Sequence, residues 1–155
     1  MLYFILGNCY NILMSYAIIS ALALLGFIIA AYIQHHKHMK RTLVCPMRAQ
    51  CHNVIHSDYS KFLSVPVEVL GMLYYFSVFL MYLLFAVFPG LSGGEFAYVL
   101  LAVSAGAVVF SIYLLFVQAF VLKEWCSWCI ASAIISTAIF LVSLSVYGIL
   151  PEFLL

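Results

Sequence analysis

Charged side chains are scarce in this sequence. Only 7% of its 155 residues are charged and 68% are hydrophobic, whereas a typical soluble domain has about 25% charged residues. A soluble fold of this length cannot bury so much apolar surface, so the composition excludes a water-soluble enzyme and predicts an integral membrane protein. The net charge of +1 gives no reason to expect a nucleic-acid partner.

The first residues also lack the charged start and the small-residue cleavage site of a signal peptide, so we expect the first apolar run to be retained. Four apolar runs are each long enough to cross a hydrocarbon core of about 30 Å. They cover approximately residues 10–33, 66–88, 96–122 and 126–150. Two of their connections are short, which predicts an all-α fold: an antiparallel bundle of four transmembrane helices in a single domain of residues 1–155. The longer connection, residues 34–65, is expected to form a capping loop over the mouth of the bundle.

Basic residues are absent from one side of this predicted bundle. Since the spans alternate in direction, residues 34–65 and 123–125 lie on the same side, which holds all six Lys and Arg residues. The positive-inside rule makes this side the cytoplasmic one, so we expect a multi-pass protein of the cell membrane whose active face is cytoplasmic. Disulfide chemistry is uncommon in that compartment, with the intracellular proteins of hyperthermophiles as the exception.

Four of the five cysteines form two close pairs, and the topology brings both pairs to the same side of the membrane. Cys126 and Cys129 lie three residues apart in the first turn of the last span, where the helix dipole favours a reactive thiolate. Cys45 and Cys51 lie in the loop, where a short, strained disulfide would exchange easily. Two such pairs indicate redox or metal chemistry rather than a secreted disulfide scaffold. The fifth cysteine, Cys9, lies on the far side and is expected to be inert.

Two residues near Cys126 and Cys129 could contact an apolar electron acceptor. Trp128 lies at the depth of an interfacial aromatic belt, where its ring could pack against a quinone. Gln118 is a polar residue inside the third span, where it could contact the acceptor or form an interhelical hydrogen bond.

The cysteine pairs are also compatible with two functions outside quinone chemistry. Both pairs could be structural disulfides in a non-enzymatic four-helix membrane protein, although a bond within one helical turn would stabilise little. His52 and His56, spaced by one helical turn, could join the loop cysteines in a zinc site. The spacing of Cys45 and Cys51 is poor for the usual zinc sites, and we expect no bound metal.

The order of these features resembles the vitamin K epoxide reductase family. The loop pair Cys45 and Cys51 comes first, Ser57 follows six residues after Cys51, Gly71 lies in the second span, and the Cys-x-x-Cys opens the last span. The likeness covers nearly the whole chain, and the order of the two pairs is its diagnostic feature. The unrelated bacterial quinone-linked disulfide oxidases have the reverse order.

The resemblance implies a role for each of these residues. Cys129 would face a quinone such as menaquinone or ubiquinone, with Cys126 as its exchange partner. Cys51 would bridge to Cys126, and Cys45 would be attacked by the thiol of an outside partner. Ser57 would help to place the quinone.

Two positions depart from the animal enzymes of that family. Those enzymes hold the oxygens of vitamin K with an Asn near the start of the second span and a Tyr one turn after the Cys-x-x-Cys. By spacing, this chain has Val67 and Ala133 there, and we expect these apolar side chains to contact the quinone without binding its oxygens. The departure favours the prokaryotic members, which resemble thiol oxidases that use respiratory quinones, and the basic loop resembles archaeal members with a cytoplasmic active face.

The expected function is therefore that of a membrane thiol:quinone oxidoreductase that drives protein disulfide formation. Many prokaryotic members carry a fused thioredoxin-like domain, and since these residues include none, the resemblance implies a thioredoxin-like partner in trans. The partner would reduce the Cys45–Cys51 pair, this pair would reduce Cys126 and Cys129, and Cys129 would reduce a quinone dissolved in the membrane lipid. Vitamin K epoxide or quinone reduction is the alternative within the family.

Overall fold

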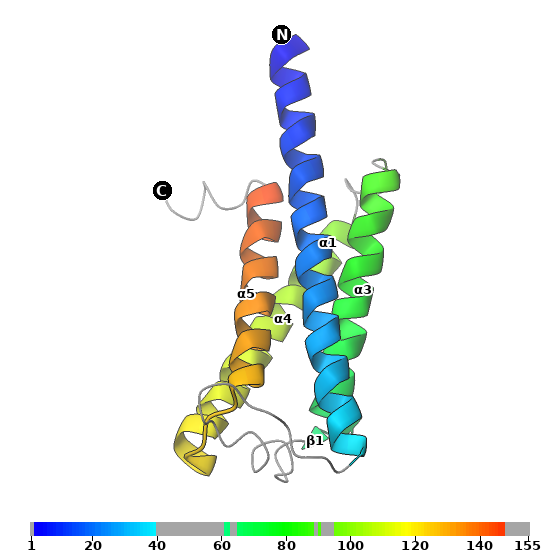
Figure 1. The fold of residues 1–155 in the computed structure, drawn as a ribbon. Coiled ribbons are helices and arrows are strands. Elements are labelled where there is room, and N and C mark those ends of the chain that lie inside the picture. The colour runs from blue at the N-terminus through cyan, green and yellow to red at the C-terminus, as the bar shows by residue number, and fades with distance from the viewer. Residues whose placement is uncertain (1, 40–60, 63–64, 89, 91–94, 148–155) are drawn as a thin grey trace.

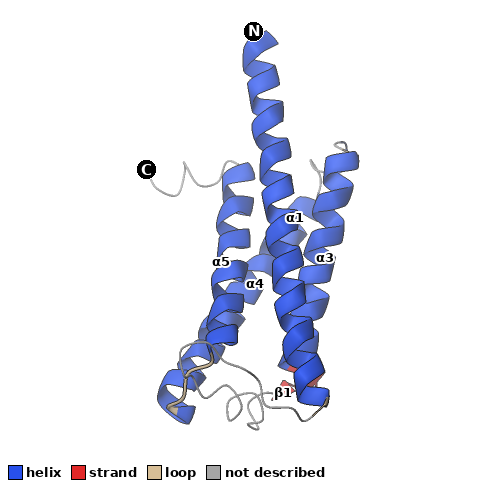
Figure 2. Cartoon of the chain, viewed as in Figure 1, coloured by secondary structure: helices blue, strands red, loops and turns tan. Residues whose placement is uncertain are grey.

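The computed structural model of the protein describes residues 2–39, 61–62, 65–88, 90 and 95–147, and its helices run side by side (Figure 1). The helices are α1 (Leu2–His38), α3 (Val67–Val87), α4 (Glu95–Phe116), the π-helix η4 (Val117–Leu122) and α5 (Ser127–Val146). Helix is the dominant structure of the described chain (Figure 2), and four segments are long and apolar enough to cross a membrane. The predicted all-α bundle of four membrane-spanning helices is therefore confirmed.

A short antiparallel β ladder precedes the second span. Its strands are β1 (Lys61–Phe62) and β2 (Val65–Pro66), with Lys61 opposite Pro66. Helix α3 follows directly, with Pro66 as its N-cap residue and Glu68 in its first turn, at the positive end of the helix dipole. The sequence pattern did not indicate this ladder. Residues 40–60 and 63–64 of the predicted capping loop lie outside the described residues.

The first helix is longer than the predicted span, which was expected to end near residue 33. Helix α1 continues to His38 because its last turns have partners. The ring of Tyr32 lies 4.4 Å from that of His36, one turn further on, and Lys37 forms an ion pair with Glu68 of α3. Polar residues at this end therefore extend the helix rather than ending it in water.

The last two spans also differ in detail from the prediction. The third span continues from α4 through the π-helix η4, so its final turn has a wider hydrogen-bonding pattern than an α-helix. Helix α5 begins at Ser127 with Cys126 as its N-cap, and it ends at Val146 rather than near residue 150. Gly148 follows in the sequence, a residue type common just beyond helix ends.

The core is built mainly where α1 packs against α3 and α5, and α4 packs chiefly against α5. The buried side chains on α1 and α3 include three aromatic rings that touch, those of Tyr16, Tyr82 and Phe85. The hydroxyl of Tyr82 donates a 2.8 Å hydrogen bond to Ser143 of α5. Such bonds between small hydroxyl residues and tyrosines fix how the apolar helices face one another.

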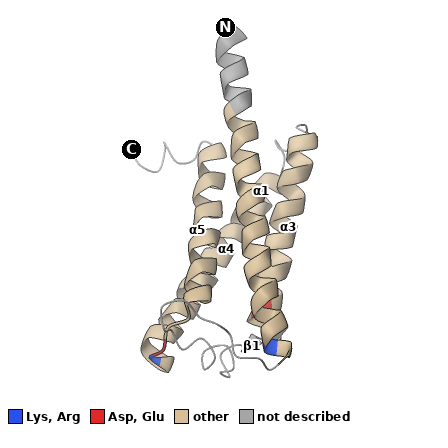
Figure 3. Ribbon diagram, in the orientation of Figure 1, with Lys and Arg blue, Asp and Glu red and all other residues tan. Residues whose placement is uncertain are grey.

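One end of the bundle is polar, and several helices begin or end there. The last turn of α1, the start of α3, η4 and the start of α5 all lie together at this end (Figure 1). The charged segments visible in Figure 3 gather at the same end. The flanks of residues 40–60 thus lie at the end of the bundle that holds Cys126 and Cys129.

Candidate functional site

Cys126 and Cys129 form a close pair of thiols at the start of α5. The Cys129 thiol donates a hydrogen bond to the sulfur of Cys126, with the two sulfurs 2.8 Å apart. The backbone N–H of Cys129 donates to the same sulfur at 3.4 Å, so Cys126 caps the helix with its side chain. Both cysteines are free thiols, and a small approach would bring them to the S–S bond length of about 2.05 Å.

The surroundings of Cys126 favour its ionised form. The hydrogen bond from the Cys129 thiol lowers the pKa of Cys126, and the backbone N–H groups of Cys129 and Trp128 lower it further. Burial of the fully buried Cys126 side chain and the negative charge of Glu68 oppose this shift in the pKa. The result is a thiolate-prone sulfur with an S–H group directly beside it, an arrangement suited to thiol–disulfide exchange.

Gln118 holds the backbone of Cys126 in place. Its side-chain Oε1 accepts a 3.2 Å hydrogen bond from the N–H of Cys126. Its own carbonyl accepts the N–H of Glu124 and that of Lys123, whose positive φ of 54° turns the chain out of η4. The Gln118 side chain is buried, so the π-helix and the first turn of α5 are joined through one polar residue. π-Helical turns occur often at functional sites.

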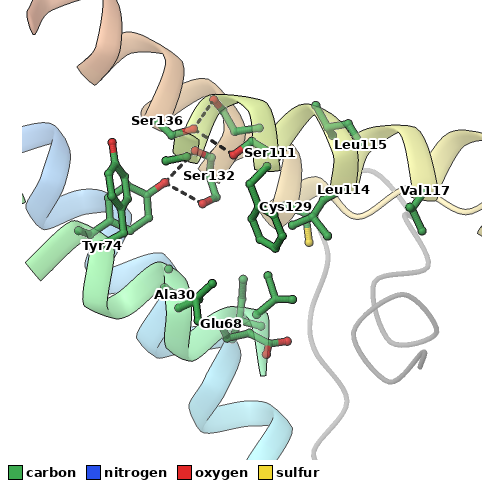
Figure 4. Close-up of a pocket in the computed structure, with 18 of the residues that line it drawn as sticks. Ala30, Glu68, Tyr74, Ser111, Leu114, Leu115, Val117, Cys129, Ser132 and Ser136 are labelled. Atoms are coloured by element: carbon green, nitrogen blue, oxygen red, sulfur yellow. Dashed lines mark hydrogen bonds between the residues drawn. The ribbon is translucent and has the colours of Figure 1, made fainter. Parts of the chain in front are cut away.

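A cavity of about 330 Å³ lies within the bundle and reaches Cys129 (Figure 4). Side chains of α1, α3, α4, η4 and α5 line it, and most of them are apolar, among them Ala30, Ile33, Leu70, Phe110 and Leu114. The volume falls in the usual range for small-molecule sites, about 300–1,000 Å³. An apolar cavity with a thiol in its wall has the chemistry needed to bind and reduce a lipid-soluble ring compound.

Hydroxyl groups line another part of the cavity wall. Tyr75 on α3 forms 2.8 Å hydrogen bonds with both the carbonyl and the hydroxyl of Ser132 on α5 (Figure 4). Ser111 on α4 lies 3.2 Å from the hydroxyl of Ser136 on α5, which also donates to the carbonyl of Ala133. A few placed polar groups in an apolar wall are typical of sites that orient a ligand.

A carboxylate also belongs to the cavity wall. Glu68 lines the cavity, and its two oxygens lie 3.0 and 3.2 Å from Nζ of Lys37 on α1. The Glu68 side chain is 8% exposed and that of Lys37 is 16% exposed, so the pair is largely buried at the polar end of the bundle.

The structure brings four of the sequence-predicted residues together around one cavity. Val67, Gln118, Cys129 and Ala133 all line it. Trp128 is not among the lining residues; its ring packs against Tyr32 of α1 with centroids 5.2 Å apart. Cys126 lies behind Cys129, buried beside Ile33. Cys45, Cys51 and Ser57 were also predicted to belong to the site, and they lie outside the described residues.

Several lining residues were not predicted from the sequence. The sequence offers one reason to expect a functional role for Glu68, because an acidic residue inside an apolar span is a functional candidate. Near the start of a helix, however, the helix dipole alone also favours an acidic residue. Tyr75 and Ser132 carried no signal, because tyrosines and serines occur throughout the spans. Their part in the cavity follows from how α3 and α5 face each other.

No group of three or more His, Cys, Asp or Glu side chains gathers within the described part of the chain. His52 and His56, the residues considered for zinc, fall within residues 40–60 and so lie outside that part.

The chain matches the model of one protein family. A family model described as "Vitamin K epoxide reductase family" matches residues 17–144, a stretch that contains the cavity, Cys126 and Cys129. A search of curated proteins found no match.

Proposed function

Because this chain belongs to the vitamin K epoxide reductase family of membrane oxidoreductases, which act with quinones, we propose that it is a thiol:quinone oxidoreductase. It oxidises a thioredoxin-like partner, reduces a quinone and so drives protein disulfide formation. The observation that carries this proposal is the position of Cys129: its sulfur lies 2.8 Å from that of Cys126, and the residue is part of the wall of an apolar cavity. One dithiol can therefore exchange with thiols through Cys126 and meet an apolar acceptor through Cys129.

The cavity fits the ring of a quinone. Its volume of about 330 Å³ and its apolar lining suit a flat, hydrophobic ring. The hydroxyl groups of Tyr75 and Ser132 and the amide of Gln118 can form hydrogen bonds with the oxygens of the ring. Val67 and Ala133 supply apolar contacts. When bound, the quinone supplies the chemistry of a two-electron acceptor.

The residues of the chain have separate tasks in this proposal. Gln118 fixes Cys126 through its backbone N–H, and the N–H groups at the start of the helix lower the pKa of the Cys126 thiol, which favours the thiolate. Cys129 faces the cavity and gives up its electrons there, and Cys126 closes the disulfide by attacking the Cys129 sulfur. The apolar wall excludes water from the sulfur that meets the quinone.

The electrons reach this dithiol from the loop. We propose that a thioredoxin-like partner reduces the Cys45–Cys51 disulfide, with Cys45 attacked first and Cys51 exchanging with Cys126, while Ser57 helps to position the quinone. The proposal is supported by the ends of α1 and α3, which flank this loop at the same end of the bundle as Cys126. Lys37, Lys61 and Lys123 also lie at that end, and by the positive-inside rule they favour a cytoplasmic active face in the cell membrane.

Within the family, the lining residues give less support to vitamin K epoxide reduction. Val67 and Ala133 line the cavity with apolar side chains, so neither can hydrogen-bond an epoxide oxygen. The respiratory quinones menaquinone and ubiquinone are therefore the proposed acceptors.

The test is quinone reduction by purified protein in lipid nanodiscs, with reduced thioredoxin as the electron donor. Wild-type protein should consume quinone and oxidise thioredoxin in equal amounts. Cys129→Ala should abolish both, whereas Cys9→Ala, which removes a cysteine far from the pair in the sequence, should retain both. Normal turnover by Cys129→Ala would refute the proposal, and so would an inert wild-type protein that is folded and binds quinone.

A further inference from the structure

Glu68 is a buried charged residue with no role in the reaction proposed above. Its side chain is 8% exposed, it lies in the first turn of a membrane-spanning helix, and it forms part of the same cavity wall as Cys129 (Figure 4). Charged residues inside membrane spans are costly and are usually kept for a function. The ion pair with Lys37 allows the carboxylate to be buried, but a purely structural pair would not need to line the cavity.

The quinone reaction requires a proton that the thiol pair does not hold. Oxidation of Cys126 and Cys129 to a disulfide releases two electrons, and reduction of a quinone to a quinol takes up two electrons and two protons. In the site, the sulfur of Cys126 is the acceptor and Cys129 carries the S–H. Closure of the disulfide needs Cys126 as the thiolate, and a pair in that form supplies one proton only, so the second proton must reach the cavity by way of another group.

Few described groups can supply this proton. The lining residues that titrate are Glu68, Tyr74, Tyr75 and Cys129. A tyrosine has an ordinary pKa of about 10, so it is a weak proton donor near neutral pH. Tyr75 is moreover held by two hydrogen bonds to Ser132. Glu68 is the remaining group, and it lies at the polar end of the bundle, where its carboxylate can take a proton from water and pass it into the cavity.

We propose, building on the function proposed above, that Glu68 is a proton-transfer residue that delivers the second proton of quinone reduction. The step balances: the Cys126 thiolate, the Cys129 thiol, the quinone and one proton from water at the polar end give the disulfide and the quinol, and Glu68 passes this proton on and ends as the carboxylate that it was before. Lys37 pairs with this carboxylate between turnovers, and water at this end of the bundle supplies the proton that Glu68 passes on. The charged and titratable groups near Glu68 are its partner Lys37 from α1 and the thiols of Cys126 and Cys129 at α5. Tyr74 and Tyr75 on its own helix line the same cavity.

The test compares two readouts in Glu68→Gln, in nanodiscs containing menaquinone. The first readout is the rate of quinol formation in a single turnover after reduction with dithiothreitol. This rate should fall by about 100-fold, the usual contribution of a positioned proton donor. The second readout is alkylation of Cys126 by iodoacetamide without quinone. It should become faster at a given pH, because the neighbouring negative charge that disfavours the thiolate has been removed.

Three further variants separate proton transfer from structural support. Glu68→Asp should recover part of the rate of quinol formation. Lys37→Met breaks the ion pair but keeps the carboxyl group, so it should lower the rate by a much smaller factor than Glu68→Gln. Glu95→Gln makes the same change in the first turn of α4, at the opposite end of the bundle, and should leave the rate unchanged.

The outcomes distinguish this proposal from the one on which it rests. If the wild-type protein forms no quinol, the proposed function is wrong and the role of Glu68 falls with it. If the wild-type protein forms quinol and Glu68→Gln forms it equally fast, the role of Glu68 alone is wrong. The role is also refuted if Glu68→Gln slows alkylation and quinol formation by the same factor, or if Lys37→Met slows quinol formation as much as Glu68→Gln does.

Discussion

Gly26 of α1 lies directly against the ring of Tyr75 of α3. A Cβ atom at position 26 would come within 2.6 Å of the ring atoms Cδ1 and Cζ. The absence of a side chain at Gly26 thus lets Tyr75 reach across to Ser132 of α5, with which it forms two hydrogen bonds of 2.8 Å. This contact places three helices around one end of the cavity wall.

Gly26→Ala should therefore destabilise the protein. The added methyl group forces the ring of Tyr75 to move, and overpacking of this kind costs about 1–3 kcal/mol. Thermal unfolding in detergent should show a lower midpoint. Gly106→Ala is the matched control: a Cβ at Gly106 meets nothing within 4 Å, so this variant should not lower the midpoint. Equal midpoints for Gly26→Ala and the wild-type protein would contradict this packing of Gly26 against Tyr75.

Gln118→Leu should loosen the start of α5. It removes the acceptor for the N–H of Cys126, and an unsatisfied buried donor costs about 1–3 kcal/mol. The unfolding midpoint should fall, and disulfide formation between Cys126 and Cys129 under oxidised glutathione should slow. Gln118→Glu keeps a side-chain oxygen acceptor and should slow that disulfide less. If the leucine and glutamate variants behave alike, the hydrogen bond is not what holds Cys126.

The reactivity of Cys126 should extend to unusually low pH. Alkylation needs the thiolate, and a lowered pKa keeps the thiolate populated at a pH where an ordinary cysteine is already protonated. Iodoacetamide labelling of Cys126, followed by mass spectrometry of its own peptide, should therefore persist below the pH range of a free cysteine.

Cys129→Ala removes the thiol that donates to Cys126, so the pKa of Cys126 should rise and the labelling profile should move to higher pH. Labelling of Cys45 and Cys51 in the same samples provides an internal reference. An unchanged profile for Cys126 in Cys129→Ala would show that this hydrogen bond does not control its ionisation.

Filling the cavity should block the quinone without harming the dithiol. Ala133→Phe adds a ring to the cavity wall and should raise the KM for quinone by about tenfold or more. Formation of the Cys126–Cys129 disulfide by oxidised glutathione should stay near the wild-type rate. Ile134→Phe is the control, because Ile134 is 63% exposed on the outer surface of the same helix turn and does not line this cavity. Equal quinone kinetics in the two variants would place the quinone elsewhere.

The spans and the position of the dithiol could be predicted from the sequence because these depend on local signals. Hydropathy marks a membrane helix almost independently of its neighbours, and Cys126 and Cys129 follow Lys123 and Glu124, the charged pair that ends the preceding span. The alternation of spans then places the ends that flank the loop next to Cys126. These steps need no knowledge of how the helices pack.

Features that depend on packing could not be predicted in the same way. The spans are apolar on all sides, so their patterns do not tell which side chains face inward. For that reason Tyr75 and Glu68 were not expected in the cavity, and Trp128 was expected there although its ring packs on Tyr32. The extension of α1 to His38 similarly depends on Glu68, a partner from another helix.

The most direct test of the central claim is a single-turnover experiment in nanodiscs. Fully reduced protein carrying Cys45→Ser and Cys51→Ser, which leaves no loop thiol to take over the disulfide, is mixed with menaquinone in the absence of any thiol donor, and quinol and disulfides are counted in the same samples. Quinol should form together with a disulfide between Cys126 and Cys129, at the same rate and in equal amounts. Quinol that forms while Cys126 and Cys129 remain free thiols, or a disulfide that forms without quinol, would contradict the claim.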